Sequence, residues 1–169
     1  KPQDVNTIGY VASDGEYLYL AVRCPEPHMD KLKLVQMSPN AGVCTDDSIE
    51  INIDMDRATE DYIQIMLNAN NVPWFWWRTK HSPQDTPDLG IKTAVFRGTN
   101  EWTCELAVPL SKIVAAAPKP GEQWGLNFAR NRYTKDFKDK KGEALSQWCP
   151  AFVWSHHIRD RFGLIEFGK

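Results

Sequence analysis

The chain has 169 residues and a mass of 19.3 kDa, which suits one domain with a sizeable hydrophobic core. Its 42% hydrophobic and 25% charged residues exclude a disordered chain, a collagen and a coiled coil. A net charge of −2 gives no electrostatic footprint for nucleic acid, and no apolar stretch reaches the roughly 18 residues of a membrane helix. We therefore expect a single domain over residues 1–169, with neither nucleic acid nor a membrane among its partners.

The first patterned segment predicts an antiparallel hairpin. Every second residue from Leu18 to Val22 is apolar, as in a strand with one buried face. A second apolar run covers residues 8–12. Asp14-Gly15 lies between the two runs and is a strong signal for a tight turn.

The middle of the chain predicts a second hairpin, in which residues 48–54 and 62–68 each alternate isoleucine or leucine with polar residues. Further strands are predicted at residues 91–96, 102–108, 124–131 and 163–167, and the best helix candidate is 109–115. The pattern indicates an all-β protein, an antiparallel β-sandwich of jelly-roll or immunoglobulin-like type with one or two short helices. The predicted core residues are Ile49, Ile51, Ile53, Ile63, Ile65, Leu67, Leu106 and Phe128.

Four cysteines are too few for a disulfide scaffold, and no pair has the CxxC spacing of a zinc site. Cys24 and Cys44 flank a proline-rich excursion, and we predict a disulfide bond between them. Cys104 has the parity of the inward residues of its strand and is predicted to be a free, buried thiol. The basic segment 130–141 is interrupted by aspartates and is interpreted as a solvated loop.

The sequence contains no phosphate-binding glycine loop, no GxSxG motif and no HExxH motif, so we predict that the protein is not an enzyme. His156 and His157 are neighbours, and on a strand they would point to opposite faces rather than to one metal ion. Four acids cluster in one turn, where carboxylate oxygens would suit calcium: Asp54, Asp56, Glu60 and Asp61. The alternative is a solvated acidic turn without a ligand, and Asp46-Asp47 is a weaker second candidate.

Three of the seven tryptophans fall in the run 74–77. On a strand, Trp74 and Trp76 would share one face, while Phe75 and Trp77 would share the other. Flat rings of this kind stack on sugars. The polar face of the 48–68 hairpin adds acceptors and donors that suit hydroxyl groups, from Glu50, Asn52, Gln64 and Asn68. The alternatives are rings buried in the sandwich core and a sheet face that is merely solvated.

Five motifs match a known family in order along most of the chain. They are DGEYLYLAV at 14–22, DDSIEINID at 46–54, WTCELAVPL at 102–110, WGLNFARN at 124–131 and FG at 162–163. The sequence resembles the family 9 carbohydrate-binding modules and their wider superfamily. This resemblance implies an antiparallel β-sandwich appended to a secreted glycoside hydrolase, notably a xylanase. It also implies structural calcium and sugar chain ends held between two tryptophans.

Residue by residue, the resemblance transfers only part of that binding site. The acid of the family motif falls on Glu50, but the two sandwiching tryptophans fall near Cys44 and near His156. The candidate carbohydrate-binding residues are therefore Glu50, Asn52, Gln64, Trp74, Trp76, Trp77, Trp154 and His156. We expect Glu50 and at least one of the tryptophans to line one surface. Arg130 should not join them, since it has the parity of the buried Phe128.

The expected function is that of a non-catalytic carbohydrate-binding module in a secreted or periplasmic protein that acts on polysaccharides such as xylan. Its expected partners are a polysaccharide or oligosaccharide and a linked neighbouring domain such as a glycoside hydrolase. The chain begins with Lys1, so we expect a processed product or a piece of a longer protein. Some relatives in the superfamily bind haem b through methionine and lysine, and the available methionines are Met29, Met37, Met55 and Met66. The last alternative is a structural module without a ligand.

Overall fold

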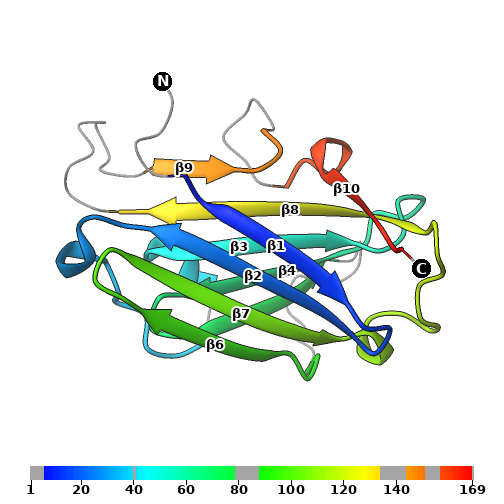
Figure 1. The fold of residues 1–169 in the computed structure, drawn as a ribbon, viewed down its shortest axis with the longest axis horizontal. Coiled ribbons are helices and arrows are strands. Elements are labelled where there is room, and N and C mark those ends of the chain that lie inside the picture. The colour runs from blue at the N-terminus through cyan, green and yellow to red at the C-terminus, as the bar shows by residue number, and fades with distance from the viewer. Residues whose placement is uncertain (1–5, 40, 79–87, 134–143, 151–156, 169) are drawn as a thin grey trace.

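The computed structural model describes residues 6–39, 41–78, 88–133, 144–150 and 157–168. Within these residues, ten strands form two antiparallel sheets that pack as a β-sandwich, which confirms the predicted fold class (Figure 1). The strands are β1 (Ile8–Ser13), β2 (Tyr17–Pro25), β3 (Ser48–Asp54), β4 (Tyr62–Asn68), β5 (Pro73–Arg78), β6 (Lys92–Arg97), β7 (Glu101–Pro109), β8 (Gln123–Arg132), β9 (Ala144–Gln147) and β10 (Gly163–Glu166). The helical elements are 3-10 turns: η1 (Met29–Lys31), η2 (Ala41–Thr45), η3 (Leu110–Lys112) and η4 (Arg159–Arg161).

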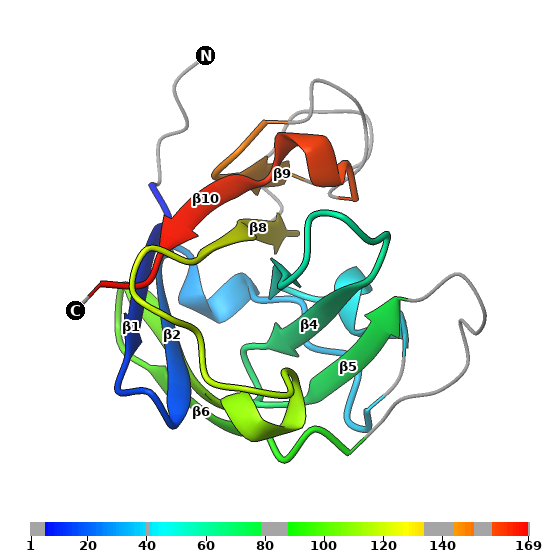
Figure 2. The same ribbon diagram turned by 90° about the vertical axis from the view of Figure 1, so that its right-hand side faces the viewer.

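The two sheets differ in size and order. Sheet A has the strand order β1-β2-β7-β6, and sheet B has the order β10-β8-β3-β4-β5, with β9 paired to β8. Figure 1 looks onto sheet A, and the turned view of Figure 2 separates β1 and β2 of sheet A from β4 and β5 of sheet B. Each sheet therefore has one face toward the core and one outer face.

The core lies between the sheets and consists of alternate residues of their strands. Ile51 of β3 is fully buried, and the register places it between Ile65 of β4 and Phe128 of β8. All eight predicted core residues are buried, as sequence alternation predicts. Sheet A and the loops add further buried residues, among them Leu18, Leu20, Val22, Trp102, Val108 and Leu110.

The turn between β1 and β2 forms at Asp14-Gly15 as predicted. Gly15 has a φ angle of 88°, in the left-handed region where a side chain would be strained. The Asp14 Oδ1 atom accepts hydrogen bonds from the backbone N–H groups of Tyr17 at 2.8 Å and Glu16 at 2.9 Å. These bonds hold the pKa of Asp14 below its ordinary value, and the bond from Tyr17 has the largest effect. The turn sets the register in which Val11 lies opposite Leu20.

The predicted strands all have counterparts, and the bounds of 48–54 and 62–68 agree residue for residue. The helix candidate 109–115 contains only the short turn η3, which follows Pro109. Strand β9 was not predicted, because four residues are too short for a clear alternation. In the described part of the chain, no helix has the length and hydropathy to cross a bilayer.

The predicted disulfide bond between Cys24 and Cys44 is wrong, because neither cysteine forms a disulfide in the structure. Cys24 points into the core from the end of β2, whereas Cys44 lies in η2 and packs against a small separate apolar cluster that includes Met66. Cys104 is free and buried, as predicted. Strand parity, which turns Cys24 inward, is therefore the better guide to this cysteine than its position at one end of the excursion, which suggested the disulfide bond.

We expect a thiol reagent to titrate four cysteines in unfolded, unreduced protein, and to react slowly with two of them in the native protein. Burial raises the pKa of the Cys24 thiol to about 12 and also raises that of Cys104, so neither forms the reactive thiolate near pH 8. Cys44 and Cys149 are partly exposed and should react first. Finding only two thiols after unfolding without reductant would restore the predicted bridge.

Candidate functional site

The candidate site is the outer face of sheet B, which is turned away from the core. Side chains two positions apart share a face of a strand, so Glu50 and Asn52 point away from the core isoleucines of β3. The register pairs Asn52 with Gln64 of β4 and Gln64 with Trp76 of β5, which sets these side chains in one row. Trp74 belongs to the adjacent row, that of Glu50. The structure thus brings five of the candidate residues to one face.

The other candidate residues lie elsewhere. Trp77 points to the opposite face of β5 and packs against the core, so it does not join the row. Trp154 and His156 lie outside the described residues. Asn68 is fully buried at the end of β4, and its amide donates to Asp46 Oδ2 at 2.9 Å, which gives it a structural partner.

Glu50 lies at the centre of a polar cluster. Its side chain is almost fully buried, at 4% exposure, and its Oε1 accepts a hydrogen bond from Asn52 Nδ2 at 3.3 Å. The Nε2 atom of His157 lies 3.7 Å from the same oxygen, and the other ring nitrogen, Nδ1, is 2.9 Å from the Tyr62 hydroxyl. Burial raises the pKa of Tyr62 to about 12, so its hydroxyl keeps the proton that it can donate to His157.

Arg78 joins this cluster to the tryptophans. Its guanidinium carbon lies 3.6 Å from the centroid of the Trp76 ring, a cation–π contact, and its Nε donates to Gln64 Oε1 at 2.9 Å. The Trp74 and Trp76 rings meet edge to face with centroids 5.5 Å apart. Among the described residues, the buried Nε1–H of Trp76 has no hydrogen-bond acceptor. The cluster therefore combines two tryptophan rings that are packed in place with an indole N–H group that has no acceptor among the described residues.

Sequence reasoning missed three members of the cluster, namely Tyr62, Arg78 and His157. Arg78 follows Trp76 by two positions on the same strand, so strand parity alone could have placed it on this face. Tyr62 likewise has the parity of Gln64. His157 has no such signal, because it reaches the cluster from a segment 95 positions beyond Tyr62.

The four acids of the predicted calcium turn do not converge. Asp54 is buried at the end of β3, and its Oδ2 accepts two hydrogen bonds from Arg159, at 2.9 and 3.0 Å. Asp56 and Glu60 are exposed, and Asp56 Oδ1 accepts instead from the backbone of Ala58. Over the described residues, no group of three or more side chains of metal-ligating type is close enough to hold an ion. Calcium binding stays a prediction from the family resemblance, without a formed site in this turn.

The second acidic candidate and the methionines also have structural surroundings. Asp46 accepts hydrogen bonds from the backbone of Val35 and Gln36, which ties the excursion after β2 to the sheet. Met66 packs in a small apolar cluster, and Met37 is 72% exposed. Met29 and Met55 pack against the main core. No geometry favours one of them as a haem ligand.

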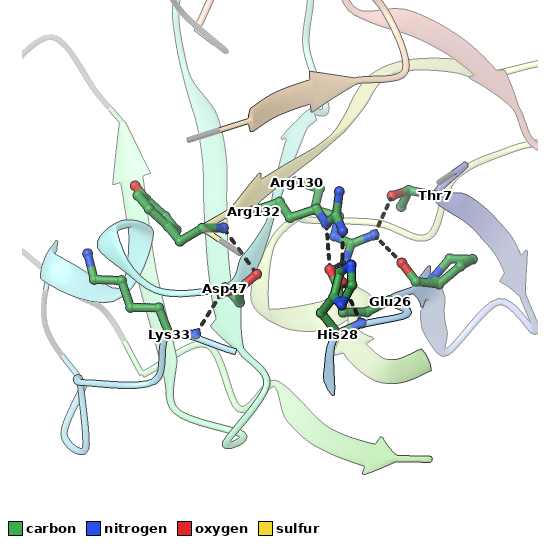
Figure 3. A network of polar contacts seen from close by, with 9 residues as sticks. Thr7, Glu26, His28, Lys33, Asp47, Arg130 and Arg132 are labelled. Atoms are coloured by element: carbon green, nitrogen blue, oxygen red, sulfur yellow. Dashed lines mark hydrogen bonds and ion pairs between the residues drawn. The ribbon is translucent and has the colours of Figure 1, made fainter. Parts of the chain in front are cut away.

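A second polar cluster lies at one end of the sandwich and is shown in Figure 3. Arg130 and Arg132 point inward from β8, and both bind the fully buried carboxylate of Glu26. The interpretation of segment 130–141 as a solvated loop is therefore wrong for these two arginines, because β8 continues through them. Arg130 faces inward, as its parity with Phe128 predicts, and stays off the candidate face.

A β-sandwich with rings and hydrogen-bonding groups gathered on one sheet face has the make-up of a ligand-binding domain. The model of the carbohydrate family 9 binding domain-like family matches residues 2–163, and the chain belongs to this family. The family is one of non-catalytic, carbohydrate-binding modules, which fits the absence of catalytic motifs from the sequence.

Solved structures show the same fold. A putative carbohydrate-binding protein from Bacteroides uniformis has a TM-score of 0.76 at 15% identity, over 98% of this chain and 80% of that one. A family 9 module from Caldicellulosiruptor kristjanssonii in complex with glucose has a TM-score of 0.68 at 18% identity, over 100% and 80%. Its complex with cellotriose gives 0.66 at 19% identity, over 99% and 77%. Among curated proteins, none is significantly similar to this chain.

Proposed function

We propose that this domain binds sugar on the outer face of sheet B, at the cluster formed by Glu50, Gln64, Trp76, Arg78 and His157. The observation that carries the proposal is the row in which Trp76 lies beside Gln64 and Arg78, next to the row of Glu50. The family is carbohydrate-binding, and the Caldicellulosiruptor kristjanssonii module of the same fold is known in complex with glucose and cellotriose.

The chemistry of the cluster suits a ligand rich in hydroxyl groups. The Glu50 carboxylate accepts hydrogen bonds, while the Arg78 guanidinium and the Trp76 indole N–H donate them. Each hydrogen bond to a hydroxyl largely replaces one to water and nets only about 0.5–1.5 kcal/mol, so stacking must add to the affinity. Trp74 and Trp76 supply the rings for stacking.

Trp74 has a further relation to the family site. The resemblance places one sandwiching tryptophan near Cys44, and Cys44 and Trp74 pack against the same small apolar cluster. The ring of Trp74 thus lies close to a position where the family has an aromatic residue. We infer that the Trp74 ring takes over part of the role of this sandwiching tryptophan, which the chain lacks near Cys44.

The finer expectations extend this proposal. We propose a secreted or periplasmic protein in which the domain is linked to a glycoside hydrolase and directs it to a polysaccharide such as xylan or a glucan, with structural calcium as in its family. Support comes from the family alone. The sequence of the full-length product tests the linkage, and a loss of thermal stability on chelation tests the calcium.

Replacing Trp76 with alanine should weaken binding of cellotriose by about tenfold, because a ring and its N–H donor are lost together. Glu50→Gln should weaken it to a similar degree, because a charged acceptor binds hydroxyl groups more strongly than an amide does. The measurement is a calorimetric titration with glucose, cellotriose and xylotriose. Trp148→Ala is the matched control: Trp148 is 53% exposed and packs beside Phe128 of β8, which β3 and β4 separate from β5.

Because Glu50 is buried, its substitution could unfold the domain, so the titration requires variants that are shown to be folded. Each variant is therefore compared by its unfolding midpoint and its near-ultraviolet circular dichroism. Wild-type affinity in both folded variants would overturn the proposed site. A wild-type protein that binds none of the three sugars would leave the structural module as the better interpretation.

A further inference from the structure

The outer face of sheet A carries a depression that no part of the proposed site uses. Its volume is about 490 Å³, and it is lined by side chains that include Tyr10 of β1, Tyr19 of β2 and Glu105 of β7. Tyr10 is 53% exposed and Tyr19 is 40% exposed. We propose that this depression is a second carbohydrate-binding surface, which holds an extended β-linked glucan or xylan chain. The choice of ligand class rests on the proposed function.

The strand register explains why the depression exists. Tyr10 lies opposite Ala21, and Ala21 lies opposite Glu105, so a small residue separates the ring from the carboxylate. In the next row, Tyr19 lies between Ala12 and Ala107. Each ring therefore has an alanine beside it across the sheet, which leaves space next to the ring for a flat ligand.

The ring of Tyr19 is held in place before any ligand arrives. Its hydroxyl donates to Asp14 Oδ2 at 2.8 Å, and the same bond raises the pKa of Tyr19. The Tyr17 ring lies beside it on the same face, with centroids 5.9 Å apart. A ring that is already ordered loses little conformational entropy when a sugar stacks on it.

The charge of the depression favours a sugar over a protein partner. Glu105 is exposed beside both tyrosines, and charged residues are depleted from the centre of protein–protein interfaces. A carboxylate is instead a good acceptor for sugar hydroxyls. Lys92 lies on the same face, opposite Ala107, so the surface carries both signs of charge and suits a neutral ligand.

The two faces of the sandwich suit different forms of one ligand class. Glu50 on sheet B is almost fully buried, so a sugar must enter a confined cluster to reach it. The tyrosines of sheet A are exposed on an open sheet face and can meet a chain along its length. We therefore assign soluble oligosaccharides to sheet B and the surface of an insoluble polysaccharide to sheet A.

The experiment measures retention on microcrystalline cellulose and on insoluble xylan in the presence of saturating glucose, which occupies the sheet B site. The double variant Tyr10→Ala/Tyr19→Ala should be retained about tenfold more weakly than the wild type, because two stacking rings are lost. Its affinity for cellotriose in solution should be unchanged. The variant Tyr10→Phe/Tyr19→Phe keeps both rings and should retain most of the binding. Phe96→Ala removes an aromatic ring that is 69% exposed on β6, outside the depression, and should have no effect.

Each outcome separates this surface from the proposed function. Retention of the alanine double variant at the wild-type level would overturn the second surface. So would a wild type that binds cellotriose in the absence of glucose but is not retained on the insoluble polysaccharides when glucose is saturating. Equal weakening by Phe96→Ala would also overturn the assignment to the depression. If the wild type binds neither cellotriose nor the insoluble polysaccharides, the proposed function fails together with this proposal.

Discussion

Replacing Glu26 with glutamine is expected to lower the free energy of unfolding by about 3–5 kcal/mol. The Glu26 carboxylate is fully buried, and it binds two buried arginines, which Figure 3 draws beside it. Its Oε2 accepts from Arg132 Nε at 2.5 Å and from Arg130 Nη2 at 3.2 Å, and its Oε1 accepts from Arg132 Nη2 at 2.8 Å. Glutamine has nearly the same shape but no charge, so two cations would stay buried without their main partner.

Urea unfolding of the two proteins measures this loss. The control is Glu101→Gln, which removes the carboxylate of a surface ion pair in which Arg23 Nε lies 2.6 Å from Glu101 Oε2. The side chains of that pair are 48% and 33% exposed, so we expect a change of less than about 1 kcal/mol. Equal losses in the free energy of unfolding would show that the buried Glu26 cluster contributes no more to stability than the surface ion pair does.

The same cluster makes a prediction about pH. Burial pushes the pKa of Glu26 upward, but the hydrogen bonds from Arg132 and His28 and the two cationic charges outweigh burial and hold the pKa below its ordinary value of 4.5. A carboxyl whose pKa is lower in the folded state stabilises the protein above its unfolded-state pKa and loses that effect as pH falls through the folded-state pKa. The difference in stability between wild type and Glu26→Gln should therefore shrink as the pH falls below the ordinary pKa of 4.5. A constant difference down to about pH 3 would contradict a charge effect.

The strands were predictable because their signal is local. Alternation in 48–54 and 62–68 specifies which side chains turn inward, and a slip by one residue would expose every isoleucine of β3 at once. The same parity placed Glu50, Gln64 and Trp76 on one face and turned Arg130 away from it. The disulfide prediction failed because strand parity was not applied to Cys24. Parity turns Cys24 inward on β2, where it is buried in the core and forms no disulfide.

The polar clusters were not predictable, because their members come together only in the folded chain. Glu26 meets Arg132 across 106 positions, and nothing near either residue in the sequence indicates the pairing. His157 reaches Tyr62 and Glu50 in the same way. In the acidic turn the converse holds: Asp54 is near the other acids in sequence, but its carboxylate is paired with Arg159, 105 positions away.

The substitution Ile51→Ala tests the centre of the core and is expected to cost about 2–5 kcal/mol of stability. Ile51 is fully buried in β3, and the register places Ile65 on one side of it and Phe128 on the other. Removing three carbon atoms there loses their transfer from water and leaves a cavity, which rigid neighbours in two paired strands cannot close.

Ile8→Ala is the matched control for this loss. Ile8 is 38% exposed on the edge strand β1, so the same change of atoms opens no enclosed cavity there, and we expect a cost of less than about 1 kcal/mol. Urea unfolding of the two variants and the wild type gives both values on one scale. If Ile51→Ala costs less than about 1 kcal/mol, then Ile51 does not lie on the core side of β3. Glu50 and Asn52 would then face inward, and the candidate sugar site on the outer face of sheet B would lose its geometric basis, because strand parity assigns both sets of residues together.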